Sequence, residues 1–102
     1  MANAERGEVD LKIGEKTYTL KFTRNAMAEV EAVFGGRPFN LLMADGSVSA
    51  IRALLWGGLR KHHPGLDLLQ AGDLMEEVNE DDLGNAIGKA VSLAFVKTAR
   101  PQ

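Results

Sequence analysis

Residues 8–22, EVDLKIGEKTYTLKF, decide the fold, because apolar and polar side chains alternate on both sides of a turn. The alternating apolar residues are Val9, Leu11, Ile13, Tyr18, Leu20 and Phe22. A period of two places each set on one face of a strand, and Gly14 can adopt the positive φ of a tight turn. Because a lone hairpin is marginally stable in water, helices must cover its apolar face. The stretch predicts an antiparallel hairpin within an α+β fold.

Helical patterns of apolar residues fill the rest of the chain. We expect four main helices at about 24–34, 48–62, 68–78 and 80–97, and a turn with a short helical piece at 38–42. The expected N-caps are Thr23, Ser47 or Ser49, Asp67 and Asn79. We expect a single domain over residues 1–102, with frayed ends at 1–6 and 99–102.

Composition narrows the class of protein. The 102 residues are 45% hydrophobic and 25% charged, as in ordinary globular domains. A net charge of −2 argues against a sequence-independent nucleic-acid binder, which needs a basic surface. The absence of cysteine excludes disulfides and thiolate metal sites. Residues 2–8 lack the apolar core of a signal peptide, and no apolar run approaches the roughly 20 residues that span a bilayer. We therefore expect a cytoplasmic protein.

Few residues in the sequence could carry catalysis or hold a metal. His62 and His63 are adjacent, so on a helix they point about 100° apart; we interpret them as solvated residues favoured by a helix C-terminus. There is neither a cysteine nor a Gly-x-Ser-x-Gly nucleophile. Five carboxylates within residues 76–82 suit the start of the last helix, although a docking site for a basic partner is an alternative. We expect no enzyme activity, no cofactor and no metal.

Trp56 is the leading candidate for a protein contact. It lies at the edge of the apolar stripe of the second main helix, near Arg52 and His63, which suits an interface or the rim of the core. Gly58 lies on the stripe itself and predicts the close approach of another backbone. The last helix is apolar over more than half its circumference, so it is central in the core or has a second face for a partner. The full set of contact candidates is Trp56, Arg52, Arg60, His63, Phe95 and Val91.

Small residues on the last helix carry a related prediction. Gly84 and Gly88 are four residues apart, a spacing that would let another helix approach closely.

The chain also resembles a known family. The hairpin with Gly7-Glu8-Val9 and Tyr18 to Thr23, a short amphipathic helix, and Arg52 to Arg60 (RALLWGGLR) running into His62-His63-Pro64 carry the likeness. They resemble the small tail-assembly chaperones of phages and gene transfer agents, which are encoded between the major tail protein and the tape measure. The resemblance covers about residues 7–78.

The resemblance implies a non-enzymatic factor that binds the tape-measure protein, the tail-tube protein or both. The apolar last helix and the Trp56 edge would suit capture of a helix in a groove. Self-association is a further hypothesis about its partners. One alternative function is a structural head–tail or tail component retained in the particle. Others are a nucleic-acid-binding regulator using Arg52, Arg60, Lys61 and the histidines, and a metal-dependent enzyme using His62 and His63.

Overall fold

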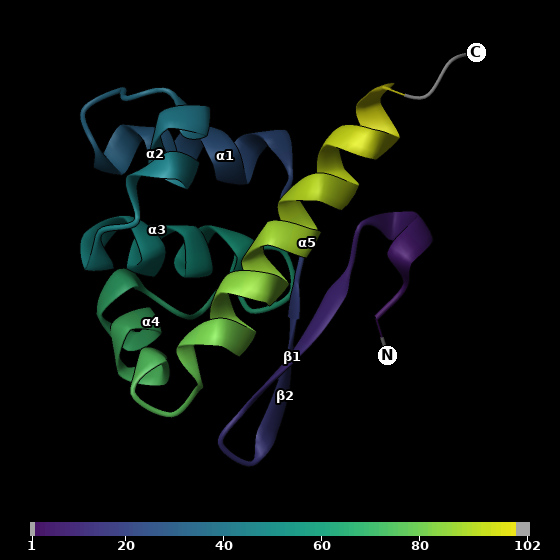
Figure 1. Ribbon diagram of the computed structural model, residues 1–102, viewed down its shortest axis with the longest axis vertical. Helices are drawn as coiled ribbons and strands as arrows, with labels where there is room; N and C mark the ends of the chain where they lie inside the picture. The colour runs from purple at the N-terminus through teal and green to yellow at the C-terminus, as the bar shows by residue number, and fades with distance from the viewer. Residues whose placement is uncertain (1, 100–102) are drawn as a thin grey trace.

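The computed structural model describes residues 2–99, which form a short 3₁₀ turn, a two-stranded hairpin and five α-helices (Figure 1). The elements are η1 (Ala4–Arg6), β1 (Val9–Ile13), β2 (Lys16–Leu20), α1 (Arg24–Val33), α2 (Phe39–Asp45), α3 (Val48–Leu59), α4 (Leu68–Met75) and α5 (Glu80–Ala99). The predicted α+β fold with an N-terminal antiparallel hairpin is confirmed. None of the helices within the described range is long and apolar enough to cross a lipid bilayer.

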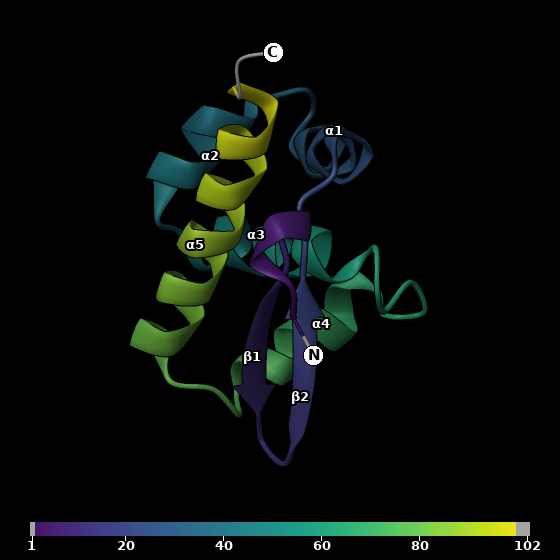
Figure 2. The ribbon, with the colours of Figure 1, turned by 90° about the vertical axis from the view of Figure 1, so that its right-hand side faces the viewer.

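The hairpin forms where the alternating pattern predicts it. Ile13 pairs with Lys16, so Gly14 and Glu15 make a two-residue loop. Gly14 has a φ of 62°, which a glycine adopts without steric cost at the first central position of such a turn. Every second residue of β1 is buried. That buried face packs against α5 along β1 and against α3 along β2, as the two ribbon views show (Figures 1 and 2).

Helix α3 is the centre of the molecule. It contacts α1, α2, α4, α5 and β2, and in Figure 1 it lies between α1 and α2 on one side and α4 on the other. Leu55 and Leu59 are fully buried, because α3 has neighbours around most of its circumference. Burying a side chain of this size stabilises the fold by about 1.5–3 kcal/mol.

Two glycines let α3 approach its neighbours closely. The backbone oxygen of Gly58 accepts a hydrogen bond of 2.8 Å from the Lys21 N–H, just after β2. A Cβ at Gly58 would lie 3.2 Å from the ring of Phe22, and one at Gly57 would overlap the side chain of Val30 on α1. The close backbone approach predicted at Gly58 is therefore confirmed.

The predicted caps are also present. Asp67 and Gln70 exchange hydrogen bonds of 2.8 and 2.9 Å as a capping box, and Ser47, the first of the two expected alternatives, caps α3. Thr23 caps α1, and the Asn79 side chain accepts hydrogen bonds from the first backbone N–H groups of α5.

Several boundaries differ from those expected. Helix α3 ends at Leu59 and not near residue 62, because the Arg60 N–H bonds to the oxygen three residues back and tightens the last turn. The same tightening ends α4 at Met75 and not near residue 78. Helix α2 is a full element that extends to Asp45.

The N-terminal residues also differ from the frayed segment expected at residues 1–6. Residues 4–6 form η1, capped by Asn3, whose N–H donates to the Glu8 carboxylate. At the other end, fraying was expected at 99–102. Ala99 is instead the last residue of α5, and residues 100–102 lie outside the described residues.

Candidate functional site

An apolar groove with a volume of about 430 Å³ lies between α2, α3 and the N-terminal half of α5. Its apolar lining consists of Leu42, Met43, Val48, Ile51, Leu54, Met75, Leu83 and Ile87. Leu42 and Ile87 are buried at its base, whereas Val48 at its edge is 73% exposed. An apolar cavity of about 150 Å³ holds a benzene ring, so the groove has room for about three large apolar side chains.

Two glycines of α5 leave its backbone accessible from the groove. Gly84 and Gly88 both line it, and apart from the adjoining residues and backbone of α5 itself, no heavy atom of the described chain lies within 4 Å of the Cβ position at either glycine. The sequence predicts the close approach of another helix here, and the structure leaves that space open. A helix entering the groove could therefore approach the backbone of α5 directly.

The rim of the groove is acidic at the start of α5. Glu80 and Asp81 line it and are exposed, and neither forms an ion pair with any residue in the range 2–99. Carboxylates in the first turn of a helix interact favourably with its positive end, so their placement there does not destabilise α5. The site thus combines an apolar base with negative charge at one end.

The contact candidates expected around Trp56 do not all lie together in the structure. Trp56 is half-buried against the core, and the Arg60 guanidinium lies 5.1 Å from its ring centroid. Arg60 Nε also donates to Glu29 Oε1 of α1 at 2.8 Å, which fixes the stack. Arg52 packs its stem on α4, and its Nε is buried with no hydrogen-bond partner in the described chain. His63, expected on the same flank, instead contacts the hairpin.

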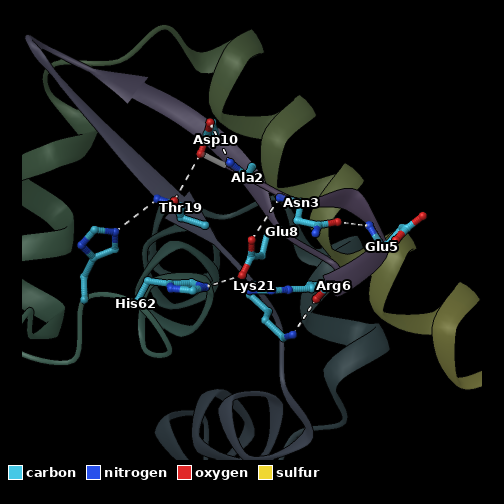
Figure 3. Close-up of polar contacts among 10 residues, drawn as sticks. Ala2, Asn3, Glu5, Arg6, Glu8, Asp10, Thr19, Lys21 and His62 are labelled. Atoms are coloured by element: carbon cyan, nitrogen blue, oxygen red, sulfur yellow. Dashed lines mark hydrogen bonds and ion pairs between the residues drawn. The ribbon is translucent and has the colours of Figure 1, made fainter.

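Both histidines link the end of α3 to the hairpin. The interpretation as a solvated residue is wrong for His63, which is half-buried, whereas His62 is exposed as expected. His62 Nε2 lies 3.0 Å from Oε2 of Glu8, a carboxylate that is only 8% exposed (Figure 3). His63 Nε2 accepts the Thr19 N–H at 3.2 Å, and its ring packs on Tyr18. Burial, followed by the neighbouring charge of His62, lowers the pKa of His63 from its usual 6.5. The acceptor role of Nε2 requires that same neutral form.

The two candidates on α5 have different surroundings. Val91 is 7% exposed and packs in the core, so it is corrected from a contact residue to a core residue. Phe95 is 50% exposed and lines a shallow hollow of about 180 Å³. The other side chains around this hollow include Arg6, Lys21, Arg24 and Met27. Phe95 therefore lies on the surface beside three cations.

The described residues also bear on two of the alternative functions, the nucleic-acid-binding regulator and the metal-dependent enzyme. Of the cations invoked for a nucleic-acid binder, Arg60 is paired with Glu29 and His63 is bonded to the backbone. Among residues 2–99, no three His, Cys, Asp or Glu side chains are grouped so that they could hold a metal ion.

The groove itself was missed by reasoning from the sequence. Its lining residues come from four helices, α2, α3, α4 and α5, and the sequence assigns most of them to core filling or capping. The one available signal was the pair Gly84 and Gly88, which lies on the groove wall.

No protein-family model matches the chain, and no curated protein or solved structure shows significant similarity to it.

Proposed function

We propose that this protein is a non-enzymatic assembly chaperone for phage-like tails, which holds apolar helices of a tape-measure or tail-tube protein before assembly. The groove between α2, α3 and α5 is the observation that carries the proposal. The resemblance of residues 7–78 to tail-assembly chaperones supplies the biological setting.

The dimensions and lining of the groove support capture of a helix. Helix-in-groove recognition uses apolar anchors at positions i, i+3 or i+4, and i+7, so a groove with room for about three side chains suits one such helix. The flexible side chains of Met43 and Met75 lie on its walls, and methionines adapt to apolar partners of different shape. Those properties suit a factor that holds many related segments of a long helical protein.

Coexpression with the neighbouring tape-measure and tail-tube proteins tests this proposal. We expect at least one of them to copurify with the chaperone and to be more soluble in its presence. Failure of both to copurify, with no gain in solubility, would contradict it.

Mass spectrometry of purified particles tests the structural alternative. A chaperone should be absent or substoichiometric in the particle. A fixed stoichiometric amount would instead favour a retained head–tail or tail component.

A further inference from the structure

The two edges of the hairpin are covered differently. On the β2 edge, the Thr19 N–H donates to His63 Nε2 and the Lys21 N–H donates to the Gly58 oxygen. Thr19 is paired with Asp10 across the hairpin. Because the backbone groups of Thr19 point outward, this is a non-hydrogen-bonded pair, and the backbone groups of Asp10 point to the opposite edge. The β2 edge is therefore covered by α3 and the turn after it, whereas β1 has an outer edge of its own.

The outer edge of β1 is open only over its middle. Even-numbered residues present their backbone groups there. The N–H groups at its two ends are bonded to other segments, Glu8 to Asn3 at 3.0 Å and Gly14 to Glu77 at 3.3 Å. Between these ends, the N–H and C=O groups of Asp10 and Lys12 form no hydrogen bond with another element of the described chain. Adjacent unpaired backbone groups on a strand edge are a template for one more strand.

A hollow of about 350 Å³ lies along this open edge, between β1 and α5. Residues 9–12 form its β1 side, and its α5 side is formed by Asp82, Asn85, Ala86 and Lys89. In Figure 2, α5 lies beside β1 on the side away from β2. A segment in the hollow would therefore have β1 along one side and α5 over its inner face.

We propose that an extended segment of another protein binds in this hollow as a third, antiparallel strand, paired with Val9–Ile13. Main-chain hydrogen bonds to Asp10 and Lys12 hold the segment, and its alternate side chains meet the two faces of the sheet. Antiparallel pairing is the more stable of the two strand directions. The hollow is separate from the groove between α2, α3 and α5, so binding here does not depend on the proposed function.

The residues of β1 define the chemistry of the bound segment. Asp10 and Lys12 point to the exposed face, and Lys12 forms no ion pair within residues 2–99. A carboxylate opposite Lys12 and a cation opposite Asp10 each form an attractive cross-strand pair. The residue between them lies opposite Leu11, on the buried face that packs against α5, so it is apolar. From its N-terminus, the bound segment therefore reads acidic, apolar, basic.

Residues 10–12 of β1 carry this same pattern, but the position of α5 excludes a second copy as the occupant. Antiparallel pairing of two β1 strands about a two-fold axis would put both α5 helices on one face of the joined sheet. Each helix would then occupy the space over the other copy's β1. Parallel pairing about a two-fold axis would turn the second copy over and place its Asp10 and Lys12 beneath Ala86 of α5. A strand with no helix attached meets neither obstacle.

Heteronuclear NMR of the full chain with the acetylated and amidated peptide Val-Glu-Val-Lys-Val tests the proposal. In the free protein, the amides of Asp10 and Lys12 should exchange with solvent quickly, and those of Thr19 and Lys21 slowly. Peptide added to about 5 mM, above the dissociation constants of about 1 mM that are typical of weak contacts, should saturate the site. It should shift the resonances of the Asp10 and Lys12 amides and slow their exchange.

Three altered peptides test the hydrogen bonds and the register. N-methylation of both Glu and Lys removes the two N–H donors that face β1, so it should abolish binding. N-methylation of the central Val, whose N–H points away from β1, should change the dissociation constant by less than about twofold. Exchange of Glu and Lys places like charges opposite each other and should weaken binding by at least about twofold.

Matched variants test the edge from the side of the protein. K12P removes an N–H that the hairpin does not use, so the hairpin should form, and the variant should bind the peptide at least about tenfold more weakly. T17P makes the same change at the cross-strand partner, on the β2 edge, and should bind as the wild type does. G84F fills the separate groove and should also bind normally. Circular dichroism checks folding, and the altered peptides decide the question even if K12P does not fold.

The proposal is overturned if the Asp10 and Lys12 amides do not respond to the peptide, or if K12P and T17P bind it equally. It is also overturned if the exchanged peptide, or the one methylated at Glu and Lys, binds as well as the original. Protection of the same amides in the free protein that grows with concentration would show a second copy at the edge and would equally overturn it. No tail protein is present, so the outcome is independent of the copurification test of the proposed function.

Discussion

The packing of α3 against α1 makes a quantitative prediction about Gly57. An alanine at this position gains about 1 kcal/mol of helix propensity relative to glycine. Its Cβ, however, would overlap Val30 Cγ2 and lie 3.7 Å from the Ala26 carbonyl oxygen. Val30 is fully buried, so it cannot move aside into solvent. Overpacking of this kind costs typically about 1–3 kcal/mol, and G57A should therefore lower the free energy of unfolding by up to about 2 kcal/mol.

G84A is the matched control, because Gly84 is also helical but has an open Cβ position. It should raise the free energy of unfolding by about 0.5–1 kcal/mol. Both variants share the gain in helix propensity, so the difference between them measures the overpacking alone. That difference of about 1–3 kcal/mol corresponds to a separation of at least about 4 °C in melting temperature.

Urea denaturation followed by circular dichroism measures both variants. A double-mutant cycle with V30A adds a second check, since removing Cγ1 and Cγ2 should make G57A less costly than it is beside Val30. If G57A is as stable as G84A, or if V30A does not change its cost, then the close packing of α3 on α1 is refuted.

Three further predictions follow from the polar contacts. Because the pKa of His63 is lowered in the folded state, the unfolded state binds more protons below about pH 6.5. The wild type therefore has the full contribution of His63 to its stability above about pH 6.5 and loses it as the pH falls. H63Q should show a smaller loss of unfolding free energy over the same acidic range. Denaturation at several pH values checks this, and an unchanged slope in H63Q would contradict it. R60A removes both the stack on the Trp56 ring and the ion pair with Glu29. It should therefore lower the free energy of unfolding by about 0.5–2 kcal/mol and alter the fluorescence of Trp56. Urea titration monitored by fluorescence measures both effects, and no change in either would contradict these contacts. D67A should cost about 0.5–2 kcal/mol in the same titration through loss of the α4 cap, and a neutral effect would argue against the capping box.

Local rules were enough to predict the hairpin and the helix starts. The period of two in residues 9–13 depends on neighbours along the chain, and the structure buries every second residue of β1. The capping box likewise joins residues only three positions apart, Asp67 and Gln70, and is present with both of its hydrogen bonds. The close approach at Gly58 could also be predicted, because glycine destabilises a helix relative to alanine and its presence on an apolar stripe indicates a closely packed neighbour.

Features that depend on tertiary packing could not be predicted in the same way. On an ideal helix His62 and His63 diverge, but α3 ends at Leu59 and the turn that follows lets both side chains reach the hairpin. Val91 was assigned to a contact surface because α5 is apolar around most of its circumference, and no pattern within one helix tells which part is covered.

The groove is the clearest case of this limit. It exists because α5 packs on β1 and α3 and leaves a space beside α2 and the end of α4, which is a property of four helices together. A sequence can mark Gly84 and Gly88 as small residues on one face, but it cannot tell whether another helix of the same chain fills the space.

Binding of the tape-measure protein to a variant with a filled groove tests the central claim most directly. G84F places a large ring in the open space of the groove, whereas N85F places the same ring on the adjacent residue, which lines a different surface beside β1. In copurification of the tape-measure and tail-tube proteins, we predict that the wild type and N85F retain the partner and that G84F loses most of it. Equal retention by G84F and N85F, or the absence of any bound partner with the wild type, would contradict the account.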